Sequence, residues 1–149
     1  MPTFSLNEAT ESALMLRRTY PLPAAKVRKT FLDGKQLEKW WPVEGAKIVF
    51  SQWEPKIGNT YRIDSKTEVG EPVVTIGEFQ DVSDQMLVFS WAREGKHDIG
   101  GTLVTVEFRK VPKGTELALT HELLPNRAAR ESHQSEWTAR LDRLQRLLA

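Results

Sequence analysis

Two adjoining stretches carry the strongest structural signal: LVTVEFRKVPKGTELALTHEL over residues 103–123 and NRAARESHQSEWTARLDRLQRLL over residues 126–148. In the first stretch apolar and polar residues alternate on either side of a Pro-Lys-Gly turn, which predicts two antiparallel strands. In the second stretch apolar residues return at four-three-four spacing, which predicts a helix with one apolar stripe: Trp137, Leu141, Leu144 and Leu148. A stripe of this length needs a buried partner, and the concave face of a sheet supplies one.

The predicted helix begins at Asn126, a residue suited to the N-cap, and at ~1.5 Å per residue it extends about 30 Å. Its opposite face is expected to carry Arg140, Arg143 and Arg146 as a solvated surface of mixed charge. On the two strands, alternation places one set of side chains inward as a floor beneath the helix: Val104, Val106, Phe108, Leu117, Leu119, His121 and Leu123.

The remainder of the chain supplies further short elements. We expect a first strand over 13–20, helices over 23–32 and 36–41, four more strands over 46–53, 60–64, 73–82 and 86–91, and polar loops over 65–72 and 94–101. Six sequential strands with short turns favour an antiparallel meander. Residues 1–11 are polar and lack periodicity, so we expect a flexible lead-in there and a single domain over 12–149.

Bulk properties exclude several classes of protein. The 149 residues are 40% hydrophobic and carry a formal net charge of +1, which gives no general attraction to nucleic acid or membranes. The chain contains no cysteine, which excludes disulfides, thiolate zinc sites and thiol catalysis and fits a cytoplasmic location. The first residues do not read as a signal peptide, and no apolar run approaches the ~20 residues of a membrane span.

Short motifs spread over nearly the whole chain carry a family resemblance: Arg18–Pro21, Trp40–Pro42, Gly77–Glu78, Leu87–Trp91, Thr102–Phe108, Gly114–Thr115, and Trp137 with Leu141 and Leu144. With these motifs the sequence resembles the START-like superfamily, and within it the family of activator of heat-shock-protein ATPase homologue-like domains. Two positions depart from the family pattern. Glu136 stands where a glycine usually precedes the helix tryptophan, and Gly58–Asn59 stands where paired glycines are common.

The resemblance implies an α+β helix-grip fold, with a curved antiparallel sheet of six to seven strands, two short helices and a long C-terminal helix across the concave face. It also implies a cleft between sheet and helix that holds an apolar or aromatic ligand. Aromatic side chains directed inward could line such a cleft. The predicted ligand-binding residues are Trp40, Tyr61, Phe89, Trp91, Phe108, Leu119, His121, Trp137 and Leu141. The alternative is that these side chains simply fill the core.

The three histidines have separate expectations. His121 shares the inward face of its strand, where it could bond a ligand or act as an acid–base group, the alternative being a core histidine with satisfied nitrogens. His133 is expected at the surface, with the pocket mouth as the alternative, and His97 is assigned to a polar loop. Their spacing does not match a zinc site, and we predict no metal, no cofactor and no catalytic residue.

The sequence thus predicts a protein that binds a small hydrophobic molecule, without nucleic-acid partners or insertion into membranes. Two alternatives stay open. One is a cyclase-like enzyme that uses the same pocket, with His121 as its leading polar group. The other is a co-chaperone-like protein-interaction module, which would need a contiguous apolar patch on the outer surface. A protein partner or a homodimer is compatible with the sequence.

Overall fold

The structure, a computed structural model, describes residues 12–43, 45–94 and 99–148. Its elements are β1 (Leu14–Tyr20), α2 (Ala24–Leu32), α3 (Gly34–Trp40), β2 (Ala46–Gln52), β3 (Thr60–Thr67), β4 (Val73–Val82), β5 (Met86–Glu94), β6 (Ile99–Val111), β7 (Gly114–Glu122) and α4 (Arg127–Leu148). The predicted lead-in over 1–11 and His97 lie outside the described residues. The order of strand, two short helices, six strands and long helix is the predicted one.

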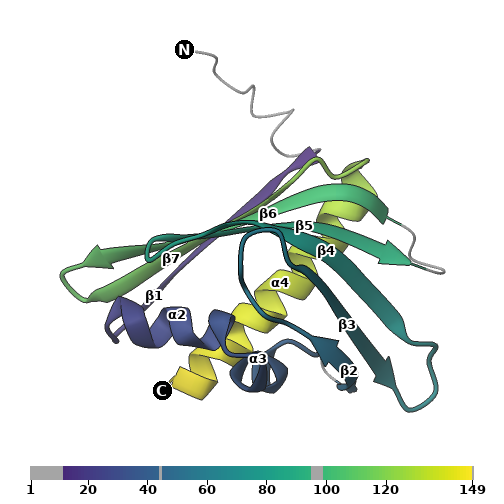
Figure 1. Ribbon diagram of the computed structural model, residues 1–149, viewed down its shortest axis with the longest axis horizontal. Coiled ribbons are helices and arrows are strands. Elements are labelled where there is room, and N and C mark those ends of the chain that lie inside the picture. Colours follow the sequence, from purple (N-terminus) through teal and green to yellow (C-terminus); the bar gives the residue numbers. More distant parts are fainter. Residues whose placement is uncertain (1–11, 44, 95–98, 149) are drawn as a thin grey trace.

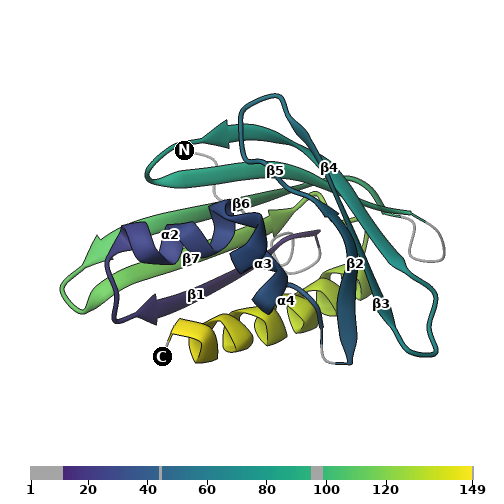
Figure 2. The same ribbon diagram turned by 60° about the horizontal axis from the view of Figure 1, so that its bottom comes forward.

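The seven strands form one antiparallel sheet in the order β1-β7-β6-β5-β4-β3-β2. From β2 to β7 each strand pairs with the next, and β1 forms the far edge by pairing with β7. The sheet curves over α4, and α2 and α3 lie on the same side of it as α4 (Figures 1 and 2). This arrangement confirms the predicted α+β helix-grip fold.

Helix α4 presents its apolar stripe to the interior, as predicted. Trp137, Leu141 and Leu144 are fully buried, and the helix lies against β1 and α3. The hydroxyl of Tyr20 donates to the carbonyl of Leu141 at 3.2 Å, which ties the end of β1 to the helix. The predicted floor on β6 and β7 is buried as well, with one exception. Leu123 is 62% exposed, because its φ of 66° turns the chain away from the direction of β7.

Two loops predicted from polar composition are partly strand. β5 continues to Glu94 and β6 begins at Ile99, so both ends of the loop predicted over 94–101 are strand. β3 likewise continues to Thr67 and stays paired with β2. The hydrogen bonds between strands are made by backbone N–H and C=O groups and do not depend on the side chains. Strand ends made of polar residues are therefore missed when strands are predicted from alternating hydrophobicity.

Two indoles complete the C-terminal end of α2. The last carbonyls of a helix have no partner within the helix and need one from outside. Nε1 of Trp40 donates to the carbonyl of Thr30 at 2.9 Å, and Nε1 of Trp53 donates to the carbonyl of Phe31 at 2.7 Å. The end of α3 and the residue after β2 are thereby held against α2.

A glycine allows a tyrosine ring to pack beneath the sheet. The register of β4 against β5 shifts between Phe79 and Asp81, and residues 77–78 lie just before this irregularity. There the hydroxyl of Tyr61 donates to the carbonyl of Ser90, while the Ser90 hydroxyl accepts from the backbone N–H of Glu78 at 2.9 Å. A Cβ at Gly77 would overlap the Ser90 carbonyl oxygen and lie 2.6 Å from Cε2 of Tyr61. Only glycine leaves room for this packing.

Gly77→Ala should therefore lower the free energy of unfolding by about 3 kcal/mol, because forcing atoms into a packed site costs about 1–3 kcal/mol or more. Urea denaturation followed by tryptophan fluorescence measures the change. Gly100→Ala is the matched control, since apart from its chain neighbours no atom of the described residues lies within 4 Å of a Cβ at that position in β6. Equal stability of the two variants would show that the close approach at Gly77 does not exist.

Candidate functional site

Eight side chains form a buried group that we call the aromatic–arginine cluster: Trp41, Trp91, Arg93, His121, His133, Glu136, Trp137 and Arg140. They come from β5, β7, α4 and the residue after α3. Trp91 lies at the centre, with ring centroids 5.4 Å from Trp41, 5.3 Å from Trp137 and 5.2 Å from His121. Only Glu136 is partly exposed, and each of the other seven residues is at most 5% exposed. The cluster is thus an aromatic interior that contains charged groups.

Arg140 is the cation among the indoles. Its Cζ lies 4.7, 5.0 and 5.6 Å from the ring centroids of Trp41, Trp137 and Trp91, within the range of cation–π attraction. Its Nε donates to the carbonyl of Trp41 at 2.8 Å. Burial lowers the pKa of Arg140 to about 9, although Glu136 opposes the shift, so the guanidinium is charged at neutral pH.

The predicted solvent-facing position of Arg140 is wrong. Three residues after Trp137, Arg140 lies only about 60° from it around the helix axis. It therefore belongs to the buried stripe, where it contacts three indoles and one backbone carbonyl. Arg143 and Arg146, further around the helix, are less buried.

Arg93 and Glu136 join β5 to α4 by a two-pronged ion pair. Nη1 and Nη2 of Arg93 lie 3.0 and 2.6 Å from the two carboxylate oxygens of Glu136. Nη2 of Arg140 lies 3.5 Å from the same carboxylate. Burial raises the pKa of Glu136, but the hydrogen bonds and charge of Arg93 outweigh it and lower the pKa to about 2. Glu136, which stands where the resembled family has a glycine, is thus a counter-ion shared by two guanidiniums.

Both ring nitrogens of His121 are bonded within the protein. The indole N–H of Trp137 donates to Nδ1 of His121 at 3.1 Å. An indole nitrogen can only donate, so Nδ1 is the acceptor and the proton of the neutral ring is on Nε2. Nε2 then donates to Oγ1 of Thr102 at 2.8 Å, and the Thr102 hydroxyl donates to the carbonyl of Trp91 at 2.8 Å. This chain of bonds links α4 through β7 and β6 to β5.

His133 is buried beside His121, with their ring centroids 5.0 Å apart, and its expected surface position is wrong. Four residues before Trp137, it shares the buried side of the helix. Its Nδ1 donates to the carbonyl of Ala129 at 2.8 Å. Burial lowers the pKa of His133, so the ring is neutral and its Nε2 is a hydrogen-bond acceptor.

Four buried atoms of the cluster have no hydrogen-bond partner among the described residues: Nε1 of Trp91, Nε of Arg93, Nε2 of His133 and Nη1 of Arg140. Three of them are donors and the fourth, on His133, is an acceptor. Buried polar groups are nearly always paired, and an unpaired one costs about 1–3 kcal/mol. Their concentration in one place makes the cluster the candidate functional site.

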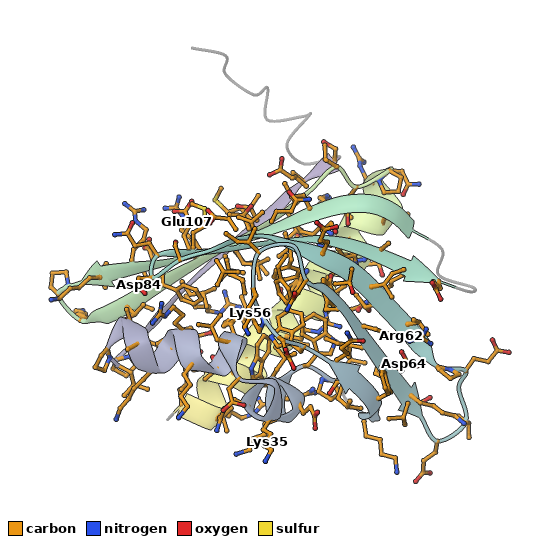
Figure 3. All side chains as sticks on the ribbon, viewed as in Figure 1. Lys35, Lys56, Arg62, Asp64, Asp84 and Glu107 are labelled. Carbon is orange, nitrogen blue, oxygen red and sulfur yellow. The ribbon has the colours of Figure 1, made fainter. Side chains whose placement is uncertain are left out.

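The nine predicted ligand-binding residues are all buried. Side chains fill the space between the sheet and the helices (Figure 3). Trp91, His121 and Trp137 belong to the cluster. The other six are arranged as follows: Tyr61 and Phe89 pack with Trp53 and Phe79, Trp40 and Phe108 flank Phe31, and Leu119 and Leu141 belong to the apolar core.

Five residues of the cluster were absent from the predicted ligand-binding set: Trp41, Arg93, His133, Glu136 and Arg140. Sequence signals for some of them existed. Arg93 follows Trp91 by two residues and so shares its face of β5, and Arg140 fits the helix stripe. A search for apolar residues on these faces does not find the charged ones.

Open hollows lie on the surface, and one of them touches the cluster at Trp91. This hollow, of about 530 Å³, lies on the outer face of β3–β5, bordered by Arg62, Glu78 and Ser90 and also touching Tyr61 and Trp91. Within the part of the chain that the structure describes, no His, Asp and Glu side chains gather as a metal site. No helix in that part is long and apolar enough to span a membrane.

Fold and cluster together define a helix-grip protein of the START-like superfamily, in which a curved sheet and a C-terminal helix enclose an aromatic interior. The chain belongs to the family of activator of Hsp90 ATPase homolog 1-like proteins, whose model matches residues 21–149. This match confirms the predicted family. Among curated proteins, none matches the chain.

Solved structures support the fold. A protein from Chromobacterium violaceum has a TM-score of 0.85 and 20% identity, over 92% of this chain and 96% of that one. The AHSA1 protein from Silicibacter pomeroyi has a TM-score of 0.84 and 20% identity, over 92% and 97%. A protein from Mycobacterium smegmatis has a TM-score of 0.80 and 14% identity, over 97% and 93%. Similarity at this level of identity establishes the fold alone.

Glu136→Gln should lower the free energy of unfolding by about 3 kcal/mol, because it leaves the buried guanidiniums of Arg93 and Arg140 without a counter-ion. Chemical denaturation at pH 7 measures the loss. Glu131→Gln on the same helix is the control, since Glu131 is 62% exposed and its pairing with Arg130 should contribute little. A loss below about 1 kcal/mol for Glu136→Gln would mean that the ion pairs are not formed.

Stability should also fall in mild acid. The unfolded state binds a proton on His121 near pH 6.5, whereas burial lowers the pKa of His121 in the folded protein to about 2. The unfolded state therefore binds more protons between these values, and this contribution, complete above pH 6.5, decreases as the pH falls. For His121 the loss at pH 5 is about 2 kcal/mol. Burial also lowers the pKa of His133, which adds to this loss of stability.

The measurement is the free energy of unfolding at pH 7.5 and pH 5 for the natural chain and for His121→Gln. Glutamine does not titrate, so the difference between the two pH values should be smaller by about 2 kcal/mol in the variant. If both proteins lose the same amount, His121 is not held neutral in the interior.

Proposed function

We propose that this protein binds a small hydrophobic or aromatic molecule between the concave face of the sheet and α4, at the aromatic–arginine cluster. The observation that carries the proposal is the set of buried polar atoms without partners among the described residues, on Trp91, His133 and Arg140 above all. Membership of the START-like superfamily supports the proposal, because the resemblance implies a ligand cleft between the same two elements.

The side chains that carry the unpaired atoms meet from two sides. Trp91 belongs to β5 and Arg140 and His133 belong to α4, and their side chains converge: the Trp91 ring centroid lies 5.6 Å from Cζ of Arg140 and 5.9 Å from the His133 ring. A core that only had to be filled would gain from apolar residues here. A bound molecule that pairs these atoms would recover the cost of burying them, while its apolar body would contact the indole faces.

For a ligand to enter the cluster, the ion pair between Arg93 and Glu136 would have to open. It lies at the margin of the cluster, because Glu136 is the one partly exposed member. Around it, side chains rather than paired backbones connect β5 to α4. In the bound state Trp91, His121 and Trp137 would contact the molecule directly. The other predicted residues would form the surrounding walls: Trp40, Tyr61, Phe89, Phe108, Leu119 and Leu141.

The two alternative functions lack a supporting observation. Catalysis by His121 would need a ring nitrogen able to exchange a proton with a substrate, and both nitrogens are bonded to Trp137 and Thr102. A protein-interaction module would need an apolar patch. The exposed large apolar residues of the described chain instead lie on β1, β2, α4 and several separate turns. The proposed binding function is compatible with the expected cytoplasmic location and does not require a protein partner.

The test is a titration with N-phenyl-1-naphthylamine, an uncharged aromatic probe, followed through the indole N–H signals in ¹H–¹⁵N NMR spectra. Five tryptophans give five signals, which single Trp→Phe substitutions assign. The signals of Trp91 and Trp137 should shift, because their indoles line the proposed site. Those of Trp40 and Trp53, already bonded to backbone carbonyls of α2, should stay in place and act as internal controls.

A saturating probe that leaves all five signals unchanged, with the protein folded, would overturn the binding proposal. Equal shifts of all five would indicate nonspecific association and would count against the cluster as the site. Native mass spectrometry of protein purified from cells then identifies any apolar compound that remains bound.

A further inference from the structure

We infer that the molecule bound at the aromatic–arginine cluster carries an anionic group, a carboxylate or a group of like charge and shape, which pairs with Arg140 and the indole N–H of Trp91. This inference rests on the proposed binding function and specifies the chemical class of the ligand. It follows from the balance of charge in the cluster and from the positions of the unpaired donors.

The charges of the cluster do not cancel. Arg93 and Arg140 each contribute one positive charge and Glu136 one negative charge, while His121 is neutral by its pattern of bonds. His133 is neutral as well, so one positive charge is left over in an interior where an uncompensated charge is costly. An anion from outside the chain would neutralise it.

Arg140 is the less completely paired of the two cations. Both carboxylate oxygens of Glu136 are engaged by Arg93 at 3.0 and 2.6 Å, whereas Nη2 of Arg140 is 3.5 Å from the nearer oxygen. Nη1 of Arg140 has no partner among the described residues. Arg140 is 3% exposed, so solvent does not take the place of a counter-ion.

The unpaired donors suit a flat anion with two oxygens. Arg140 offers Nη1, and Trp91, whose ring centroid is 5.6 Å from Cζ of Arg140, offers its indole N–H. A carboxylate can accept from both, one oxygen to each donor, and bonds of this charge-assisted kind are stronger than neutral ones. The indole faces of Trp41 and Trp137 next to Arg140 then suit an apolar, ring-shaped body attached to the anion.

The experiment compares naphthalene-2-carboxylate with naphthalene-2-carboxamide by isothermal titration calorimetry at pH 7.5. The two compounds have the same ring and nearly the same shape and differ in charge. The carboxylate should bind about tenfold more tightly or better, because only it neutralises Arg140. Equal affinities would overturn the inference and leave the binding function intact. If neither compound binds and the uncharged naphthylamine probe also fails, the binding function itself is wrong.

Variants locate the effect. Arg140→Gln should lower the affinity for the carboxylate about tenfold and bring it to that of the amide. Arg146→Gln, an exposed arginine of the same helix, should leave both affinities unchanged. An Arg140→Gln protein that folds and still prefers the carboxylate would refute the role of Arg140. If this variant does not fold, the comparison of the two compounds on the natural chain still tests whether the ligand is anionic.

Decanoate, titrated in the same way, separates the two sources of an apolar carboxylate. Tighter binding of decanoate than of the naphthoate would identify a fatty acid, and the reverse would identify an aromatic acid. Either preference supports an anionic ligand, provided that decanamide, the neutral amide, binds more weakly than decanoate.

Discussion

Helix α4 can be held beneath a curved sheet only by side chains that span the space between the two backbones. At the centre of the interior, Trp137 is the side chain that does so. Its indole packs against Trp91 and Trp41. Its N–H starts the chain of hydrogen bonds through His121 and Thr102 to the carbonyl of Trp91. Because an indole is both large and a directional donor, it sets the distance of the helix from the sheet and its rotation together.

The charges of the interior follow from this placement. Once Trp137 faces the sheet, the helical period brings Glu136 and Arg140 to its flank, and the two-residue period of β5 brings Arg93 to the same side as Trp91. The ion pairs and the indole faces compensate most of the cost of burying these groups. The network is nevertheless incomplete, since donors on Arg140 and Trp91 lack partners among the described residues.

An incomplete polar network inside an aromatic interior differs from an ordinary core in its consequences. An apolar replacement of the same volume would avoid the cost of burying two guanidiniums, so the cluster is poorly explained as a device for stability. It is well suited to recognition, because a ligand that supplies the missing partner gains both a charge-assisted bond and contact with indole faces. The hollow on β3–β5 differs from the cluster because it is open at the surface, and its border mixes polar side chains such as Arg62 and Glu78 with apolar ones such as Ile76.

Periodicity along the chain was enough to predict the strands over 103–123 and the helix over 126–148, because side-chain direction in a strand or helix repeats locally. The helix-grip fold was predicted from the family resemblance. Periodicity also pointed Trp91, His121 and Trp137 inward. The partners of Arg140 could not be predicted in this way. Trp41 lies 99 residues away in sequence, and a search for apolar faces places an arginine in solvent. Which buried atoms are paired, and which are left for a ligand, is decided only when distant elements pack together.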